Sequence, residues 1–209
     1  VRIRRLPISR DERLLLQLCD TQIELRESRA HVTQRVQLLN LGEVTYVFPV
    51  RGVRYDLPRG ALAFQTEPVM TDQHVSESHG VVEIHGSLPP GGVLVGWAFD
   101  LPLDGPTLDV SFPVHVRTYQ MRVIADAPDG ATLSVEAVMS GEGSQFGPAE
   151  QAEVEGRSVL FTQLERSPQD PPLERVEIRL SGIPTPGPLR WIAVFLAVGL
   201  LLGALALVA

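Results

Sequence analysis

Between residues 21 and 182 hydrophobic residues recur at every second position, and this alternation is the feature that most constrains the fold. It is clearest in the stretches 32–38, 108–112 and 176–180. A period of two places neighbouring side chains on opposite faces of a strand, and it is typical of a half-buried β-sheet. About twelve short strands, separated by turns rich in Gly and Pro, therefore predict an all-β chain. The pattern lacks the crossover helices that a parallel α/β fold requires.

We expect these strands to form one or two antiparallel β-sandwich modules. Pro113 suggests a boundary between a first module over 21–113 and a smaller one over 114–182. A single continuous sandwich is the alternative. Trp97 lies in the most apolar predicted strand, over 93–99, and is expected to be the core aromatic residue of the sandwich.

Residues 1–20 are rich in arginine and are interpreted as a leader or linker. Within them, the sequence from Ser9 to Glu12 fits a capping box, so a short helix over 10–18 is possible. A solvated linker that enters the first strand is an equally good interpretation. A third hypothesis is that the arginines bind anionic lipid headgroups.

The last 19 residues, 191–209, contain no charged, amide or hydroxyl side chain and no proline. At about 1.5 Å per residue, a helix of this length spans the hydrocarbon core of a bilayer. Trp191 and Arg190 stand where an interfacial aromatic residue and a headgroup-binding cation are expected. The sequence therefore predicts a single C-terminal transmembrane helix, which the Pro- and Gly-rich spacer 183–190 separates from the β part.

Gly199 and Gly203 form a G-x-x-x-G pattern within this predicted helix. Small residues four positions apart allow two membrane helices to approach closely. We therefore consider a homodimer, or assembly into a membrane complex, through Gly199 and Gly203. The alternative is that glycine is simply common in membrane helices.

Composition narrows the classes of function. The formal net charge of −7 argues against non-specific nucleic-acid binding, and all 18 basic residues are arginine. The absence of lysine excludes Schiff-base catalysis and a Walker A site. Cys19 is the only cysteine, so no internal disulfide can form, and we interpret it as a small apolar residue. We predict no cofactor and no enzyme activity, because no catalytic motif is present.

Histidines and aspartates offer no convincing metal site in the sequence. We interpret the histidines as surface residues, because their spacing does not bring two of them together. Three aspartates around the turn 99–105 lack the spacing of a calcium loop and are interpreted as strand-end turn residues, while a weak calcium site remains the alternative. These residues are His31, His74, His79, His85 and His115, and Asp100, Asp104 and Asp109.

Two polar segments, 66–80 and 140–156, are interpreted as loops that present side chains to a partner. The glycines of 141–147 do not match a phosphate-binding loop, because the third glycine is displaced and no lysine follows. The candidate interaction residues of the two segments are Asp72, His74, His79, Glu142 and Phe146.

Three stretches, GSLPPGGVLVGWAFDLPLDG (86–105), VRTYQMRVIADAPDG (116–130) and SGIPTPGPLRW (181–191), carry a resemblance to a known kind of protein. The chain resembles single-pass bacterial envelope proteins of high-GC, myxobacteria-like genomes, in which a β-sandwich ectodomain precedes one transmembrane helix. Some of these carry a carboxypeptidase-regulatory-like sandwich further upstream. The resemblance implies that a signal peptide precedes Val1, and it brings no catalytic residue.

Three functions remain open from the sequence. The first is a membrane-anchored, non-catalytic module of the cell envelope that binds a protein or glycan partner. The second is an accessory subunit that assembles through the transmembrane helix, and the third is a carboxylate-dependent hydrolase without a recognisable motif. We expect the β part to be periplasmic or extracytoplasmic, while a cytoplasmic, tail-anchored protein is the alternative that Arg190 favours.

Overall fold

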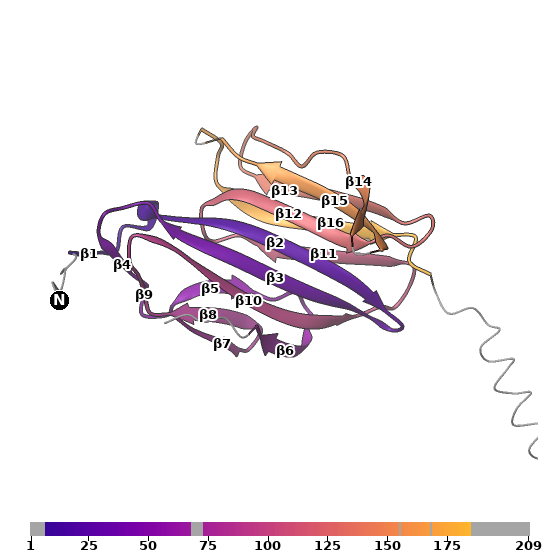
Figure 1. Ribbon diagram of the computed structural model, residues 1–209, viewed down its shortest axis with the longest axis horizontal. Helices are drawn as coiled ribbons and strands as arrows, with labels where there is room; N and C mark the ends of the chain where they lie inside the picture. The colour runs from indigo at the N-terminus through magenta and orange to yellow at the C-terminus, as the bar shows by residue number, and fades with distance from the viewer. Residues whose placement is uncertain (1–6, 68–72, 155, 168, 185–209) are drawn as a thin grey trace, which may run out of the picture.

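The computed structural model describes residues 7–67, 73–154, 156–167 and 169–184, and these form a β-sandwich without an α-helix (Figure 1). The prediction of an all-β fold is confirmed. The strands are β1 (Ile8–Ser9), β2 (Leu15–Arg26), β3 (Arg29–Asn40), β4 (Thr45–Val47), β5 (Val53–Asp56), β6 (Leu62–Thr66), β7 (His74–Ser78), β8 (Val81–His85), β9 (Ser87–Leu88), β10 (Gly91–Pro102), β11 (Thr107–Pro113), β12 (Thr118–Asp126), β13 (Thr132–Met139), β14 (Glu150–Val154), β15 (Arg157–Glu165) and β16 (Leu173–Ser181).

One layer of the sandwich is a continuous seven-stranded sheet with the order β14-β15-β12-β2-β3-β10-β6. Its long central strands, β2 and β3, pair in register over their whole length. Alternate residues of β3 are buried, as the period of two predicts. The buried set from β3 includes Val32, Val36 and Leu38, each with no exposed surface. The continuous sheet therefore supplies one uninterrupted wall of the core.

The opposite layer is divided into separate sheets. Two of them, with the orders β5-β8-β7 and β11-β16-β13, both pack against β10. The ring of Tyr55 on β5 lies 5.0 Å from Trp97, and Phe112 on β11 lies 6.5 Å from Phe99. Trp97 is fully buried, which confirms its prediction as the core aromatic residue. A small third sheet, β1-β4-β9, lies at the amino-terminal end of the molecule (Figure 1).

The sheets cross the expected boundary at residue 113. Strand β11 ends at Pro113 and pairs with β16, while β12 beyond it pairs with β2. Both sides of the boundary contribute to one hydrophobic core. This arrangement matches the single continuous sandwich that the sequence left as the alternative.

Two strand pairs depart from the expected antiparallel pattern. Strands β2 and β12 are parallel, and so are β1 and β4. The chain between β2 and β12 is long enough to return to the same end of the sheet, so this pair needs no crossover helix. The sequence periodicity could not reveal it, because alternation is the same in parallel and antiparallel strands.

The amino-terminal segment contains more strand than expected. Asp11 caps a single 3₁₀ turn over Glu12–Leu14, and its side chain accepts a hydrogen bond from the Arg13 backbone N–H at 3.1 Å. Strand β2 begins directly afterwards at Leu15, so the possible helix over 10–18 is wrong. Leu15 and Cys19 alternate into the core, and their burial outweighs the local capping signal.

The carboxyl-terminal end of the described chain lies against the core. Ile183, the first residue of the expected spacer, is buried, and its N–H donates to the Pro106 carbonyl at 2.9 Å. Gly182 has a φ of +78°, and a Cβ there would lie 2.4 Å from the Gly130 carbonyl oxygen. This tight turn requires glycine. Residues 185–190 of the spacer and the predicted helix over 191–209 lie outside the described residues.

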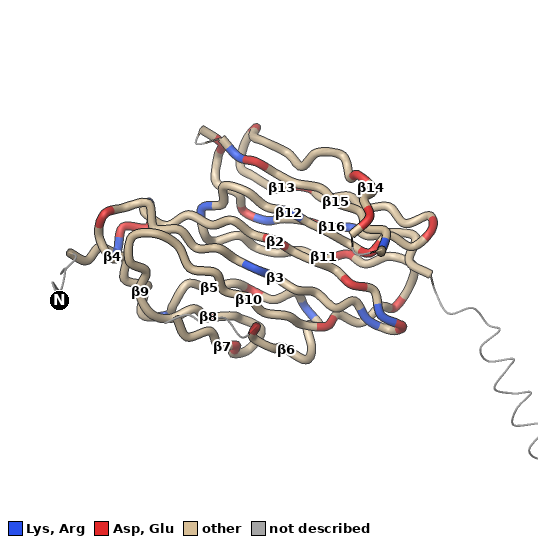
Figure 2. Tube along the Cα trace, in the orientation of Figure 1, with Lys and Arg blue, Asp and Glu red and all other residues tan. Residues whose placement is uncertain are grey.

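A cluster of ionisable side chains on β3 and β10 surrounds the buried Asp100 of the continuous sheet. Asp100 lies within β10, where its carboxylate accepts hydrogen bonds from Arg29 and from His31 Nδ1, both at 2.8 Å. The hydrogen bond with His31, followed by that from Arg29, holds the pKa of Asp100 below its usual value. Its interpretation as a turn residue is therefore wrong, because β10 continues to Pro102. Elsewhere acidic and basic residues are interspersed along the strands in the view of Figure 2.

Candidate functional site

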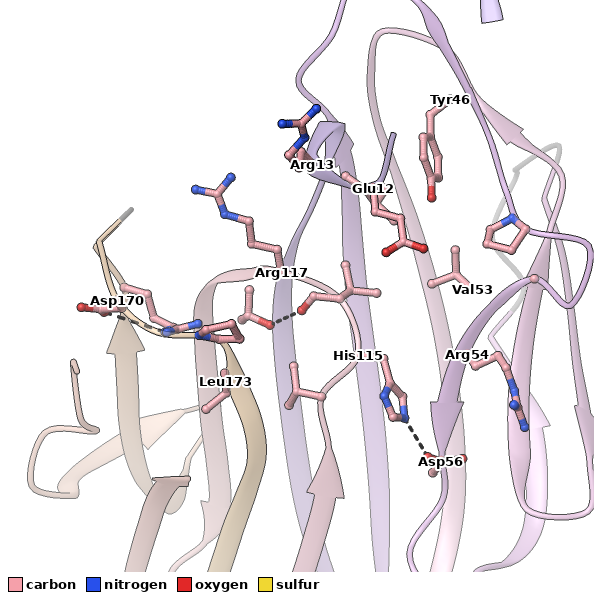
Figure 3. Close-up of a pocket in the computed structure, with 18 of the residues that line it drawn as sticks. Glu12, Arg13, Tyr46, Val53, Arg54, Asp56, His115, Arg117, Asp170 and Leu173 are labelled. Atoms are coloured by element: carbon pink, nitrogen blue, oxygen red, sulfur yellow. Dashed lines mark hydrogen bonds and ion pairs between the residues drawn. The ribbon is translucent and has the colours of Figure 1, made fainter. Parts of the chain in front are cut away.

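A cleft of about 630 Å³ opens at the end of the sandwich where β2 begins (Figure 3). It lies where the β5-β8-β7 and β11-β16-β13 sheets part, so the division of that layer creates it. Four chain segments line it, and their residues are Glu12, Arg13 and Leu15; Tyr46, Pro49, Gly52, Val53, Arg54 and Asp56; Val114, His115, Val116, Arg117 and Thr118; and Arg166, Ser167, Asp170, Pro172 and Leu173.

One wall of the cleft is β5 together with the turn that precedes it. Gly52 closes this turn by donating its N–H to the Pro49 carbonyl at 2.8 Å. Its φ is +73°, and a Cβ would lie 2.8 Å from the Ile84 carbonyl oxygen, so the turn requires glycine. The turn sets where β5 starts and hence where Arg54 and Asp56 lie along the wall.

One pair of side chains bridges the cleft between the β5-β8-β7 sheet and the β11-β16-β13 sheet. His115 Nε2 lies 2.8 Å from Asp56 Oδ2, and Figure 3 shows the imidazole reaching from the 114–117 segment toward β5. The two side chains are 50% and 38% exposed. The bridge is solvated, and a pair of this kind contributes little to stability.

A buried polar network forms the floor beneath the cleft. The Gln17 side chain donates to Thr118 Oγ1 at 2.8 Å and accepts from the Tyr55 hydroxyl at 2.7 Å. The Tyr55 ring packs against Trp97 at an interplanar angle of 50°, and the Trp97 indole N–H donates to Gln34 Oε1 at 3.0 Å. Burial raises the pKa of Tyr55 well above its ordinary value, so the phenol stays protonated. The network ties β2, β5, β10 and β12 together and makes the floor rigid.

A buried arginine lies in the wall opposite β5. The Arg166 side chain is only 5% exposed, and burial lowers the pKa of its guanidinium. Its terminal nitrogen donates to the Pro171 carbonyl, whereas its Nε has no hydrogen-bond partner among the described residues. The nearest carboxylate, Asp170 Oδ2, is 3.8 Å from that Nε. Hydrogen bonds from Ser144 and Ser167 lower the pKa of Asp170, which keeps this acid ionised beside the arginine.

The other three arginines of the cleft are more exposed. Arg13 forms an ion pair with Asp11 at 2.8 Å, outside the cleft lining, and Arg54 lies 3.8 Å from Glu83. Arg117 has no hydrogen-bond or ion-pair partner for its guanidinium in the part of the chain that the structure describes. The cleft thus offers one free cation and one loosely paired cation to a ligand.

The three carboxylates of the lining do not form an acid–base pair. Asp56 is hydrogen-bonded to His115, and Asp170 accepts hydrogen bonds from the backbone N–H groups of Ser167 and Ser144. Figure 3 shows Glu12 near Tyr46, on the other side of the cleft from Asp170. Two carboxylates that flank a bond to be hydrolysed would need to face each other, which these do not.

The residues expected to contact a partner do not meet at the cleft. His74 opens β7 opposite His85, and His79 occupies the next turn with a φ of 55°. Glu142 is exposed, whereas Phe146 packs against the core. Asp72, Arg190, Trp191, Gly199 and Gly203 lie outside the described residues. Among the residues that the structure does describe, no three His, Cys, Asp or Glu side chains gather as metal ligands.

The two segments interpreted as loops contain strands. Residues 74–78 form β7 and residues 150–154 form β14. The intervening chain near Gln145 is also held, because this side chain exchanges two hydrogen bonds with the Ala137 backbone. The interpretation of 140–156 as a loop is therefore wrong for residues 150–154. Its polar sequence had hidden β14, which has every residue exposed.

The sequence did not identify the cleft itself. Its residues come from four segments, of which the first and the last lie about 150 positions apart. The pairings of β12 with β2 and with β15 bring three of these segments together. The signal available in the sequence was two polar residues soon after Pro113, His115 and Arg117, and they match no motif.

Comparisons with known proteins give little further guidance. No family model matches the chain, and no curated protein matches it. Among solved structures, it is similar to an M1 zinc metallopeptidase from Deinococcus radiodurans, with a TM-score of 0.41 and 15% identity over 79% of this chain and 42% of that one. A two-domain M1 zinc metallopeptidase mutant bound to L-tryptophan gives 0.41 and 16%, over 80% and 43%. The chain spans less than half of these structures, and likenesses so distant define neither a shared fold nor an activity.

Of the helical segments that the structure describes, none is long and apolar enough to cross a membrane.

Proposed function

We propose that the chain is a membrane-anchored, non-catalytic interaction module of a bacterial cell envelope, and that its β-sandwich binds a protein or glycan partner in the cleft. The observation that carries this proposal is the cleft itself. It has a rigid hydrogen-bonded floor and walls from several segments, and the guanidinium of Arg117 lacks a partner among the described residues. Concave, partly apolar sites with a few placed polar groups are where ligands bind.

The sequence supports the anchoring part of the proposal. The apolar residues 191–209 follow the β part closely, with a short spacer between them. In this arrangement the sandwich is held near a membrane surface and its cleft faces an adjacent partner. Alkaline carbonate extraction tests the anchor, since an integral protein stays in the pellet. Release of the full chain into the supernatant would contradict it.

Protease accessibility tests the side of the membrane. An extracytoplasmic sandwich is cleaved once the outer barrier of the cell is opened. A sandwich that stays protected until the inner membrane is lysed is cytoplasmic, and the envelope part of the proposal then fails.

Binding in the cleft is tested with a bulky substitution that leaves the charges unchanged. Ser167 is exposed and lines the cleft, while the nearby Gln169 is exposed and does not. We expect Ser167→Trp to abolish binding of peptides and oligosaccharides that an array screen of the full chain in detergent identifies. Gln169→Trp is the matched control and should retain binding. Equal binding by both variants would exclude the cleft as the site.

A further inference from the structure

The cleft combines an unpaired strand edge with arginines that lack full partners. Strand β5 is an outer strand of its sheet and pairs with β8 alone among the described strands. Its neighbour across the cleft, β11, pairs with β16 on the far side. The two strands approach each other without a ladder between them, and this edge of β5 makes no ladder with another described strand.

The cleft lining carries more positive charge than negative charge, although the chain as a whole is acidic. The whole chain has a net charge of −7, whereas the cleft lining holds four arginines and three carboxylates. Two of these carboxylates, Asp56 and Asp170, already have partners within the protein. Glu12 is the third, and it lies beyond Arg117 toward Tyr46 (Figure 3). The cations that remain for a ligand are Arg117 and, in part, Arg54.

Arg166 gives a second indication that the cleft binds a ligand. Its side chain is almost wholly buried in the cleft wall, yet its Nε has no hydrogen-bond partner among the described residues. A buried N–H without a partner destabilises the fold, because it loses its hydrogen bonds to water and gains none in the protein. A ligand oxygen or a ligand-bound water at the cleft wall would satisfy it.

Resting on the proposed function, we infer that the partner is a protein and that the cleft takes an extended, acidic segment of it. The segment adds a strand to the free edge of β5 through main-chain hydrogen bonds. Its carboxylates meet the guanidinium of Arg117 and that of Arg54, and charge-assisted hydrogen bonds of this kind are among the stronger polar contacts. The cleft therefore recognises the extended backbone of the segment and its negative charge.

The test uses the full chain in detergent and a fluorescein-labelled octapeptide of alternating valine and glutamate, with both ends blocked. We expect saturable binding that weakens with added salt, because the contacts are between exposed charges. A second peptide has glutamine in place of glutamate, and a third carries an N-methyl group on every residue so that neither of its edges can donate hydrogen bonds to a strand. Both should bind at least about tenfold more weakly.

Variants assign the binding to the cleft. Arg117 is exposed and unpaired among the described residues, so Arg117→Glu should fold normally and weaken binding of the acidic peptide by about tenfold or more. Arg157 is the matched control, since it lies at the opposite end of the sandwich, and Arg157→Glu should leave binding unchanged. Equal effects of the two variants, or equal binding of the N-methylated peptide, would overturn the inference.

An acidic oligosaccharide, such as an oligogalacturonate, separates this inference from the proposed function. If it binds and Ser167→Trp abolishes that binding, while the acidic peptide does not bind, the cleft is a glycan site and the inference of a peptide strand fails. If no probe binds wild type more tightly than Ser167→Trp, the proposed function fails as well.

Discussion

The two layers of the sandwich are built from the same alternating sequence but differ in continuity. One is an unbroken seven-stranded sheet, while the other is divided into separate sheets that meet without a ladder. Residues on the continuous layer, such as Val36 and Trp97, are completely buried. The side chains that bridge the divided layer, His115 and Asp56, are largely solvated. Both layers supply fully buried core residues, including Val82 and Leu180 in the divided layer. The difference is that the divided layer leaves a solvated gap, and the candidate site lies at this gap.

The largest expected difference is between the reactivity of a thiol buried in the continuous layer and that of a thiol placed in the cleft. Cys19 is buried in β2, and burial raises its pKa to about 12 from a usual value of 9.0. Its thiolate should therefore be about a thousandfold scarcer than that of an ordinary thiol. A cysteine introduced at the cleft by Ser167→Cys is exposed and should react rapidly with Ellman's reagent.

Wild type should release no thionitrobenzoate until urea unfolds it, and Ser167→Cys should release one equivalent at once. Ser167→Cys combined with Cys19→Ala identifies which thiol reacts. Rapid labelling of Cys19 in the folded protein would show that the continuous layer opens readily, and the comparison of the layers would fail.

The next effect is on the free energy of unfolding. Trp97→Ala removes the largest fully buried side chain of the core, together with its contact with Tyr55 and its hydrogen bond to Gln34. We expect a loss of about 3–5 kcal/mol, because the change leaves a cavity. Urea unfolding of the full chain, followed by circular dichroism, measures it. Arg117→Glu in the cleft should change the same quantity by less than about 0.5 kcal/mol, and similar losses would contradict this difference between the core and the cleft.

The charge cluster on the continuous layer should give a smaller, pH-dependent effect. Asp100→Asn weakens the bonds to Arg29 and His31 and should cost about 1–3 kcal/mol near neutral pH. The folded-state pKa of Asp100 lies below its usual 3.8, so its stabilisation is complete above that value and is lost as the pH falls through the folded pKa.

Unfolding curves of wild type and Asp100→Asn should therefore converge in acid. Asp109→Asn is the control, since its ion pair with Arg179 is exposed, and it should have almost no effect at any pH. A difference that grows toward acid pH would contradict the assignment to the carboxylate.

The sequence predicted the buried strand faces of both layers, but not the exposed strands or the pairing of distant strands. The alternation in 32–38 and 176–180 identified buried strand faces correctly, because burial of every second residue is a local consequence of strand geometry. Strand β14 was missed because all its residues are exposed and so carry no hydrophobic signal. The pairing of β2 with β12 was missed because register and direction depend on chain segments far apart.

The cleft was unpredictable for the same reason. The cleft exists because β5 and β11 do not pair with each other. The sequence of a strand does not show which neighbour it fails to pair with. Single residues were misjudged where tertiary contacts decided their role. Asp100 looked like a turn residue, yet Arg29 and His31 stabilise it within β10.

The smallest effect is expected at the bridge across the cleft. His115→Gln and Asp56→Asn each remove one side of a solvated pair, and each should cost less than about 1 kcal/mol. A double-mutant cycle on these two residues, measured by urea unfolding, should give a coupling of about 0.2–1 kcal/mol that declines with salt. A coupling above about 2 kcal/mol would mean that the pair holds the β5-β8-β7 and β11-β16-β13 sheets together. The divided layer would then depend on one contact for its stability, and a ligand that enters the cleft would have to break it. A weak coupling instead means that the strand edge of β5 can be exposed to a ligand at little cost, as binding in the cleft requires.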